Sequence, residues 1–271
     1  MRIAWQDLLF PGSAAAFFER DPLPIFDPHR VEYSSANAWW LAELSRIVYR
    51  LGEFESVQPL RPLRREFMSR IGLDEIGLFR SDETGTGAVL VKSRGADPFA
   101  VLVFRGTEQE IQDLLHDADT WPVVAFGGKA LVHRGFNNAL ASVWTPIEAA
   151  LRTIDCPLFY TGHSLGAALA TLAAARRAPS VVYTFGSPRV GDLGLCELLT
   201  RIPFHRVVHG SDIVTTVPPE ILGFRHVGAE RHIGASGLND FVLDPRLIFD
   251  QLTTPIGPLA DHAPINYVNM V

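Results

Sequence analysis

The spacing of apolar residues changes along the chain, and the changes predict both helices and strands. From Ser35 to Leu51 apolar side chains recur at intervals of three and four residues, which predicts an amphipathic helix that ends at Gly52. Two short Val-rich runs, Gly87–Ser93 and Phe99–Arg105, are separated by a turn and predict a pair of strands. The chain therefore combines helical and extended segments from early on.

After Gly128 helical and extended patterns alternate regularly. The expected helices are about Asn137–Thr153, Leu165–Arg177 and about Leu193–Arg201, and the expected strands are Leu158–Thr161, Val181–Phe185 and Phe204–His209. Strands separated by helical segments imply crossover connections, which build a mostly parallel sheet with helices on both faces. We therefore expect one α/β domain over residues 1–271.

Composition and charge exclude several classes of protein. The 271 residues are 47% hydrophobic and 20% charged, and the net charge is −6. Without a run of Lys or Arg, the chain has no electrostatic footprint for nucleic acid. No apolar run approaches the roughly 18 residues that a transmembrane helix needs. Two cysteines, Cys156 and Cys196, are too few for a disulfide framework or a zinc site, and we expect two buried thiols rather than one bridge.

The N-terminal segment has some of the apolar character of a signal peptide. However, Pro11–Ser13 interrupt the apolar stretch Leu8–Phe18, and Asp7 offsets the positive charge of Arg2. A secretory signal has a basic start followed by an unbroken apolar stretch. We therefore expect this segment to belong to the folded protein and the protein to be cytoplasmic, with secretion as the alternative.

A candidate nucleophile stands between a predicted strand and a predicted helix. Residues Gly162–Gly166 read GHSLG and fit the pattern G-x-S-x-G, with an apolar strand before them and an Ala-rich helix after them. A serine on such a turn has strained backbone and an exposed Oγ beside the helix N-terminus. The alternative is a glycine-rich turn with an incidental serine. We expect Ser164 to be a nucleophile.

A nucleophilic serine needs a base and an acid, which follow it in this fold in the order acid, then histidine. Asp212 directly follows a predicted strand, where working groups of parallel sheets gather. Asp192 is the second candidate, although it also fits a helix N-cap before Leu193. His262 lies late in the chain in a polar turn and suits the base best. The other downstream histidines, which we expect to be structural, are His205, His209, His226 and His232.

Five stretches in a fixed order resemble the class 3, fungal-type triacylglycerol lipases of the α/β-hydrolase superfamily. They are Phe104–Glu108 (FRGTE), His133–Phe136 (HRGF), Thr161–Ala170 (TGHSLGAALA), Tyr183–Asp192 (YTFGSPRVGD), and Ser211–Pro219 (SDIVTTVPP) with Asp261–His262 beyond. The resemblance implies the α/β-hydrolase fold and favours Asp212 and His262 as acid and base. It also implies an oxyanion hole formed by the backbone N–H groups of Thr107 and Leu165. Residues 1–75 lie outside the motifs and form an N-terminal elaboration.

The family resemblance also implies a lid after Thr107. Within residues 108–120, Ile111, Leu114 and Leu115 share one face of a short helical pattern whose other positions are mainly acidic or polar. Such a pattern suits a flap that covers an apolar groove and makes transient contact with a lipid interface. A surface helix that packs these residues into the core is the alternative.

These features together predict a serine carboxylic-ester hydrolase. The leading hypothesis is a lipase that cleaves acylglycerol esters through Ser164, Asp212 and His262, with no cofactor and no metal. A phospholipase A1, a feruloyl-type esterase or an acyltransferase would use the same residues. A hydrolase fold without activity, which binds a lipid or a protein, is the alternative from another class.

Overall fold

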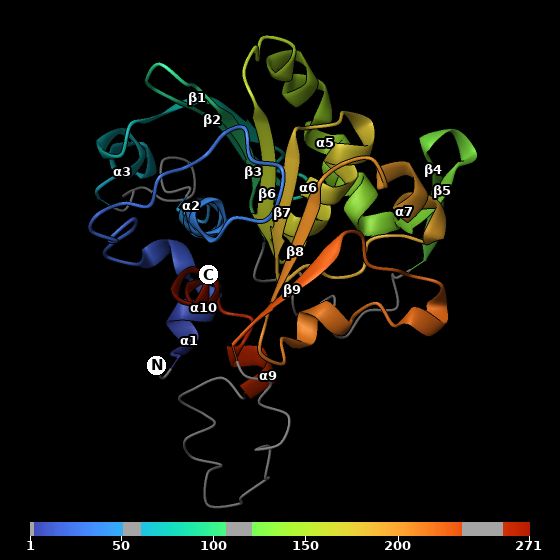
Figure 1. The fold of residues 1–271 in the computed structure, drawn as a ribbon. Helices are drawn as coiled ribbons and strands as arrows, with labels where there is room; N and C mark the ends of the chain where they lie inside the picture. The colour runs from blue at the N-terminus through green and yellow to red at the C-terminus, as the bar shows by residue number, and fades with distance from the viewer. Residues whose placement is uncertain (1–2, 51–60, 107–120, 235–256) are drawn as a thin grey trace, which may run out of the picture.

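The computed structural model describes residues 3–50, 61–106, 121–234 and 257–271. A seven-stranded sheet with strand order β1-β2-β3-β6-β7-β8-β9 runs through its centre (Figure 1). The strands of this sheet are β1 (Leu73–Arg80), β2 (Gly87–Ser93), β3 (Ala100–Phe104), β6 (Leu158–His163), β7 (Val181–Phe185), β8 (Phe204–His209) and β9 (Ala229–Ile233). The β1–β2 and β2–β3 pairs are antiparallel, and all later neighbours are parallel. The expected mostly parallel sheet is thus confirmed.

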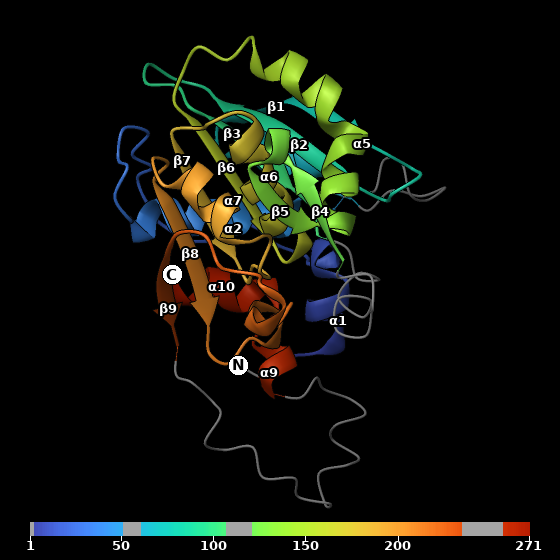
Figure 2. The ribbon, with the colours of Figure 1, turned by 90° about the vertical axis from the view of Figure 1, so that its right-hand side faces the viewer.

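Helices cover both faces of the sheet (Figures 1 and 2). One face carries α5 (Arg134–Leu151), α6 (Leu165–Arg176) and α7 (Leu193–Leu199), and the other carries α2 (Ser35–Ile47), α3 (Arg64–Arg70) and α10 (Pro264–Met270). Central strands are therefore buried on both sides, and their side chains alternate between two cores. On β3, Leu102 packs with the α5–α6 core, whereas Val101 and Val103 pack with the α2 core.

Several elements were not expected from the sequence. They are α1 (Trp5–Leu9), α3, β1, the short helix α9 (Gly257–Ala260), the 3-10 turns η1 (Pro11–Ser13), η2 (Phe126–Gly128), η3 (Ile213–Thr216) and η4 (Glu220–Leu222), and the hairpin of β4 (Pro122–Ala125) and β5 (Ala130–His133). Strands β1 and β9 lie at the two edges of the sheet. Edge strands face solvent over much of their length, so they lack the continuous apolar run that identifies a buried strand.

Two expectations about the whole chain can be compared with the described residues. Among them, no helix combines the length and the apolar character needed to cross a bilayer. Cys156 and Cys196 are both free thiols, and each is partly rather than fully buried. The predicted unpaired state is confirmed, whereas the predicted burial is only partial, because each cysteine lies at the margin of the α5–α6 core.

Candidate active site

Ser164 occupies the sharp turn between β6 and α6. Its backbone has φ 59° and ψ −127°, a conformation that is strained for a residue with a Cβ. The Ser164 N–H donates to the carbonyl of Phe185 at the end of β7, 3.0 Å away, which ties the turn to the neighbouring strand. Strained backbone at a strand–helix junction is typical of a functional nucleophile.

The two flanking glycines are required by close backbone packing. A Cβ on Gly162 would lie 2.3 Å from the backbone of Gly166, and a Cβ on Gly166 would lie 2.2 Å from the carbonyl oxygen of Phe104. Both distances are far below van der Waals contact, and both partners are backbone atoms that cannot turn aside. The turn that carries Ser164 therefore forms only with glycine at both positions.

Asp212 and His262 come together although 50 residues separate them. Asp212 follows β8, and His262 lies between α9 and α10. His262 Nδ1 lies 2.9 Å from Asp212 Oδ1 and 2.8 Å from Oδ2, and both side chains are fully buried. Because the carboxylate accepts the Nδ1 proton, a neutral His262 presents its lone pair at Nε2. Within the described part of the chain, that Nε2 atom has no hydrogen-bond partner.

Further donors hold the Asp212 carboxylate. Its Oδ1 accepts a hydrogen bond from Val214 N at 2.9 Å, and its Oδ2 accepts one from the Tyr267 hydroxyl at 2.5 Å. Burial, together with the negative charge of Asp212, raises the pKa of Tyr267 well above its usual value, so the phenol remains a donor. Sequence reasoning missed Tyr267, because its position in α10 became meaningful only when α10 packed beside β8.

Two more residues near this pair were not singled out from the sequence. Gly186 has φ 58°, and a Cβ there would lie 2.7 Å from Asp212 Oδ2 and 3.0 Å from His262 Nδ1. His163, which precedes Ser164, stacks obliquely on His262 with ring centroids 4.4 Å apart. Both residues lie inside motifs of the class 3 lipases, but spacing alone did not reveal what their side chains contact.

The competing candidates all have structural partners. Asp192 caps α7 by accepting a hydrogen bond from Leu195 N, as its alternative interpretation expected. His205 contacts the carbonyl of Val31 at 2.9 Å, and His226 contacts that of Thr215 at 2.8 Å. The last two competitors, His209 and His232, lie near the carboxylates of Asp261 and Glu230, respectively.

The remaining predicted site residues divide into two groups. Leu165 begins α6, so its N–H is one of the amides at the helix N-terminus that have no acceptor within the helix. The other oxyanion candidate, Thr107, and the candidate lid at 108–120, with Ile111, Leu114 and Leu115, lie outside the described residues. The predicted roles of Thr107 and of the lid residues therefore remain predictions.

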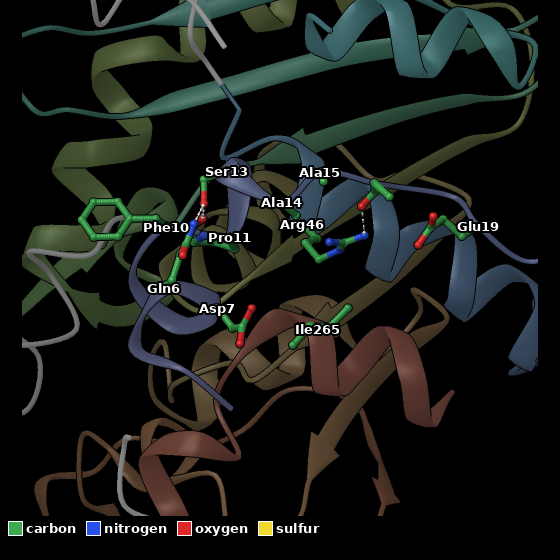
Figure 3. Close-up of a pocket in the computed structure, with 11 residues that line it drawn as sticks. Gln6, Asp7, Phe10, Pro11, Ser13, Ala14, Ala15, Glu19, Arg46 and Ile265 are labelled. Carbon is green, nitrogen blue, oxygen red and sulfur yellow. Dashed lines mark hydrogen bonds between the residues drawn. The ribbon is translucent and has the colours of Figure 1, made fainter. Parts of the chain in front are cut away.

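A separate cavity of about 330 Å³ lies among α1, η1, α2 and α10 (Figure 3). Asp7 and Glu19 line it together with Arg46, whose guanidinium is already paired with Glu43 and the carbonyl of Ala16. Asp212 and His262 are not among its lining residues. In the described part of the chain, no group of three or more His, Cys, Asp or Glu side chains is arranged to hold a metal ion.

Comparison with known proteins identifies relatives for much of the chain. Residues 101–222 match the family model for lipase (class 3). The chain is 35% identical over 169 residues to the secreted mono- and diacylglycerol lipase 1 of Fusarium solani, covering 57% of this chain and 50% of that protein. It is 38% identical over 120 residues to the chloroplastic phospholipase A(1) DAD1 of Arabidopsis thaliana, covering 40% of this chain and 27% of that protein.

The comparison corrects the expected location. The Fusarium solani relative is named as a secreted enzyme, so the cytoplasmic location expected from the N-terminal segment is wrong. That expectation depended on charge and proline positions near the N-terminus alone, and these describe only one kind of export signal.

A solved structure shares most of the fold. The crystal structure of the lipase from Rhizopus microsporus var. chinensis superposes with a TM-score of 0.61 at 26% sequence identity, covering 82% of this chain and 83% of that one. The chain spans half or less of the length of the two sequence relatives named above. The strained Ser164 turn, the mostly parallel sheet and these matches together show that the chain has the α/β-hydrolase fold and that its residues 101–222 are those of a class 3 lipase.

Proposed function

We propose that this protein is a serine carboxylic-ester hydrolase that cleaves acylglycerol esters, with Ser164 as nucleophile, His262 as base and Asp212 as the acid that orients it. The observation that carries the proposal is the buried Asp212–His262 pair: the imidazole has an unpaired Nε2 and stacks obliquely on His163, the neighbour of Ser164. The names of the lipase relatives support the substrate class.

The proposed reaction proceeds through an acyl-enzyme. Ser164 Oγ attacks the ester carbonyl carbon while His262 Nε2 takes the Oγ proton. Asp212 accepts the Nδ1–H throughout and stabilises the imidazolium that forms. The tetrahedral intermediate then collapses, the bond to the alcohol breaks, and His262 returns the proton to the leaving oxygen. Water, activated in turn by His262, attacks the acyl-enzyme and releases the fatty acid and Ser164.

The developing oxyanion needs donors already in place. Leu165 N–H at the start of α6 supplies one, and the N-terminal end of the helix dipole favours negative charge there. We assign the second donor to Thr107. Loss of one such donor costs about 10²–10³ in rate in hydrolases of this kind.

The proposed lid and its contact with lipid remain part of this proposal. In the sequence pattern, Ile111, Leu114 and Leu115 share the apolar face that would meet the interface. Immediately after the lid segment, Trp121 is 68% exposed and Val124 is 69% exposed, and Val124 faces the exposed Leu131 across the β4–β5 hairpin. Exposed large apolar side chains beside a lid support transient contact with a lipid surface.

A second candidate activity is phospholipase A1. The similarity to the Arabidopsis thaliana phospholipase A(1) favours it specifically. The same three catalytic residues would act on the sn-1 ester of a phospholipid, so only the groove and the substrate head group distinguish the two activities.

The test compares the wild type with Ser164→Ala. Wild type should hydrolyse p-nitrophenyl esters and emulsified triacylglycerol, and Ser164→Ala should lose at least about 10⁴ in kcat. A p-nitrophenyl alkylphosphonate should add one phosphonyl group to wild type, with loss of p-nitrophenolate, and none to the variant. Ser45→Ala is the matched control and should retain activity, because it removes a buried serine hydroxyl on α2 that bonds Thr161 and no residue of the triad.

Three outcomes decide the proposal. Hydrolysis of triacylglycerol that depends on Ser164 supports the lipase. Ser164-dependent hydrolysis of phosphatidylcholine, with little on triacylglycerol, supports the phospholipase instead. A folded wild type that hydrolyses no ester, with or without detergent, and takes up no phosphonate would overturn the ester-hydrolase proposal.

A further inference from the structure

A chain of two hydrogen bonds, one part-buried and one buried, joins the N-terminal elaboration to the backbone of His262. The Tyr49 hydroxyl lies 3.0 Å from His163 Nδ1, and His163 Nε2 lies 2.7 Å from the carbonyl oxygen of His262. Tyr49 follows α2, which packs on β6 across the sheet from α6 (Figure 1). The connection therefore begins outside the region that matches the family model and ends at the proposed base.

The direction of both hydrogen bonds follows from elementary chemistry. A carbonyl oxygen only accepts, so His163 Nε2 carries the proton in the shorter bond. Burial, with the His262 ring beside it, lowers the pKa of His163 well below its usual value, so the ring is neutral and has a single N–H. His163 Nδ1 is then an acceptor, and the Tyr49 O–H donates to it. Tyr49 thereby selects the tautomer that points a donor at His262.

The carbonyl bond restrains a part of His262 that Asp212 does not reach. Asp212 holds the imidazole at Nδ1, which still allows the residue to shift with its backbone. His163 holds the backbone itself, from the position directly before Ser164. The two restraints together define where Nε2 lies relative to the serine.

Space around the Tyr49 hydroxyl is tightly limited. A Cβ on Gly106 would lie 2.2 Å from that oxygen and 2.9 Å from the carbonyl oxygen of His163. The hydroxyl thus fills the volume that a side chain at 106 would occupy, one residue before the proposed oxyanion donor Thr107. The nearby Gly106 backbone therefore limits movement of the hydroxyl on that side.

We propose that Tyr49 and His163 are positioning residues of this enzyme. Through the Tyr49–His163–His262 hydrogen-bond relay, they hold the His262 backbone in place so that its imidazole lies correctly relative to Ser164. The proposal rests on the proposed function, because it assigns His262 the role of base. Neither residue reacts with substrate, and both act through the placement of His262.

Simple packing is the competing explanation, because the His163 ring also contacts His262 and Tyr267. Two substitutions of similar length separate the explanations. His163→Gln keeps an N–H donor near the position of Nε2, whereas His163→Met fills similar space and has no donor. Tyr49→Phe removes only the hydroxyl. Tyr183→Phe, which removes another buried hydroxyl that binds Ser34 N, is the matched control.

The kinetic test measures kcat and KM on a soluble p-nitrophenyl ester, with the unfolding midpoint of each variant. We expect His163→Met to lose about tenfold or more in kcat with KM nearly unchanged, because a displacement of about 1 Å costs up to about 10²-fold. His163→Gln should stay within about threefold of wild type. Tyr49→Phe should lose about three- to tenfold in kcat. In the double variant, it should cause no loss of kcat beyond that of His163→Met alone. Tyr183→Phe should match wild type.

A second measurement does not depend on ester hydrolysis. The ¹⁵N chemical shifts of labelled histidine should identify His163 as the Nε2–H tautomer in wild type and a mixture of tautomers in Tyr49→Phe. Equal losses in the Gln and Met variants, additive losses in the double variant, or an Nδ1–H tautomer in wild type would each overturn the relay. A wild type without esterase activity would overturn the proposed function instead. The tautomer of His163 would still show whether the two hydrogen bonds have the proposed donors and acceptors.

Discussion

Gly186 offers a severe test of the proposed site, because it lies far from Asp212 and His262 in sequence and makes no chemical contribution of its own. In Gly186→Ala the new Cβ would lie 2.7 Å from Asp212 Oδ2 and 3.0 Å from His262 Cε1 and Nδ1. Ordinary contacts begin near 3.4 Å, so the pair must move by roughly 0.4–0.7 Å. Both side chains are fully buried and closely packed, so they cannot move aside together. The displacement therefore changes the geometry of the Asp212–His262 hydrogen bonds.

We expect this displacement to lower kcat about 10- to 100-fold, since a 1 Å misplacement of a catalytic group costs about 10²-fold. The KM for a soluble ester should change little, because the Cβ points at the Asp–His pair. Alanine at φ 58° also costs roughly 1–2 kcal/mol of stability. Hydrolysis of a p-nitrophenyl ester gives kcat and KM, and urea unfolding gives the stability change.

Gly223→Ala separates the two effects. Gly223 has φ 89°, and no atom lies within 4 Å of the position its Cβ would take. This control should therefore lose a similar free energy of unfolding and keep its kcat. If Gly186→Ala retains wild-type kcat, or if both variants lose kcat in proportion to stability, the assignment of Asp212 and His262 as the reacting pair is refuted.

Three further predictions use other contacts. Tyr267→Phe leaves Asp212 with one donor fewer and should reduce stability by about 1.5–3 kcal/mol and kcat several-fold, measured by urea unfolding and ester hydrolysis. Asp192→Ala removes the cap on α7 and should cost about 0.5–2 kcal/mol without changing kcat; a large loss of kcat would instead favour Asp192 as the acid. Burial lowers the pKa of His226 to about 4, so the unfolded chain, with its histidine pKa near 6.5, binds more protons between these values. The free energy of unfolding should fall as pH drops from about 6.5 to 4, with a contribution on the order of 3 kcal/mol that His226→Gln abolishes in unfolding curves at both pH values.

The local features of this protein could be predicted from its sequence. The Val-rich runs gave strands β2 and β3 almost at their observed bounds, and the alternation after Gly128 predicted the helices and strands from α5 to β8. These elements are buried on one or both sides, so their burial appears directly as a run or a period of apolar residues. The Gly–x–Ser–x–Gly turn was predictable for a similar reason, because close packing allows only glycine at its flanks.

The meeting of distant residues was decided only by the tertiary structure. Five histidines follow Ser164, and spacing alone left His262 as one candidate among them, until the fold brought it within 2.8 Å of Asp212. Tyr267 and Tyr49 carry no signal in the sequence, and Gly186 stands out only as part of a family motif, because their contacts arise where α10, the end of β7 and the end of α2 converge. Periodicity records which side of an element is buried, whereas the identity of the atom on the other side of a contact depends on how separate elements pack.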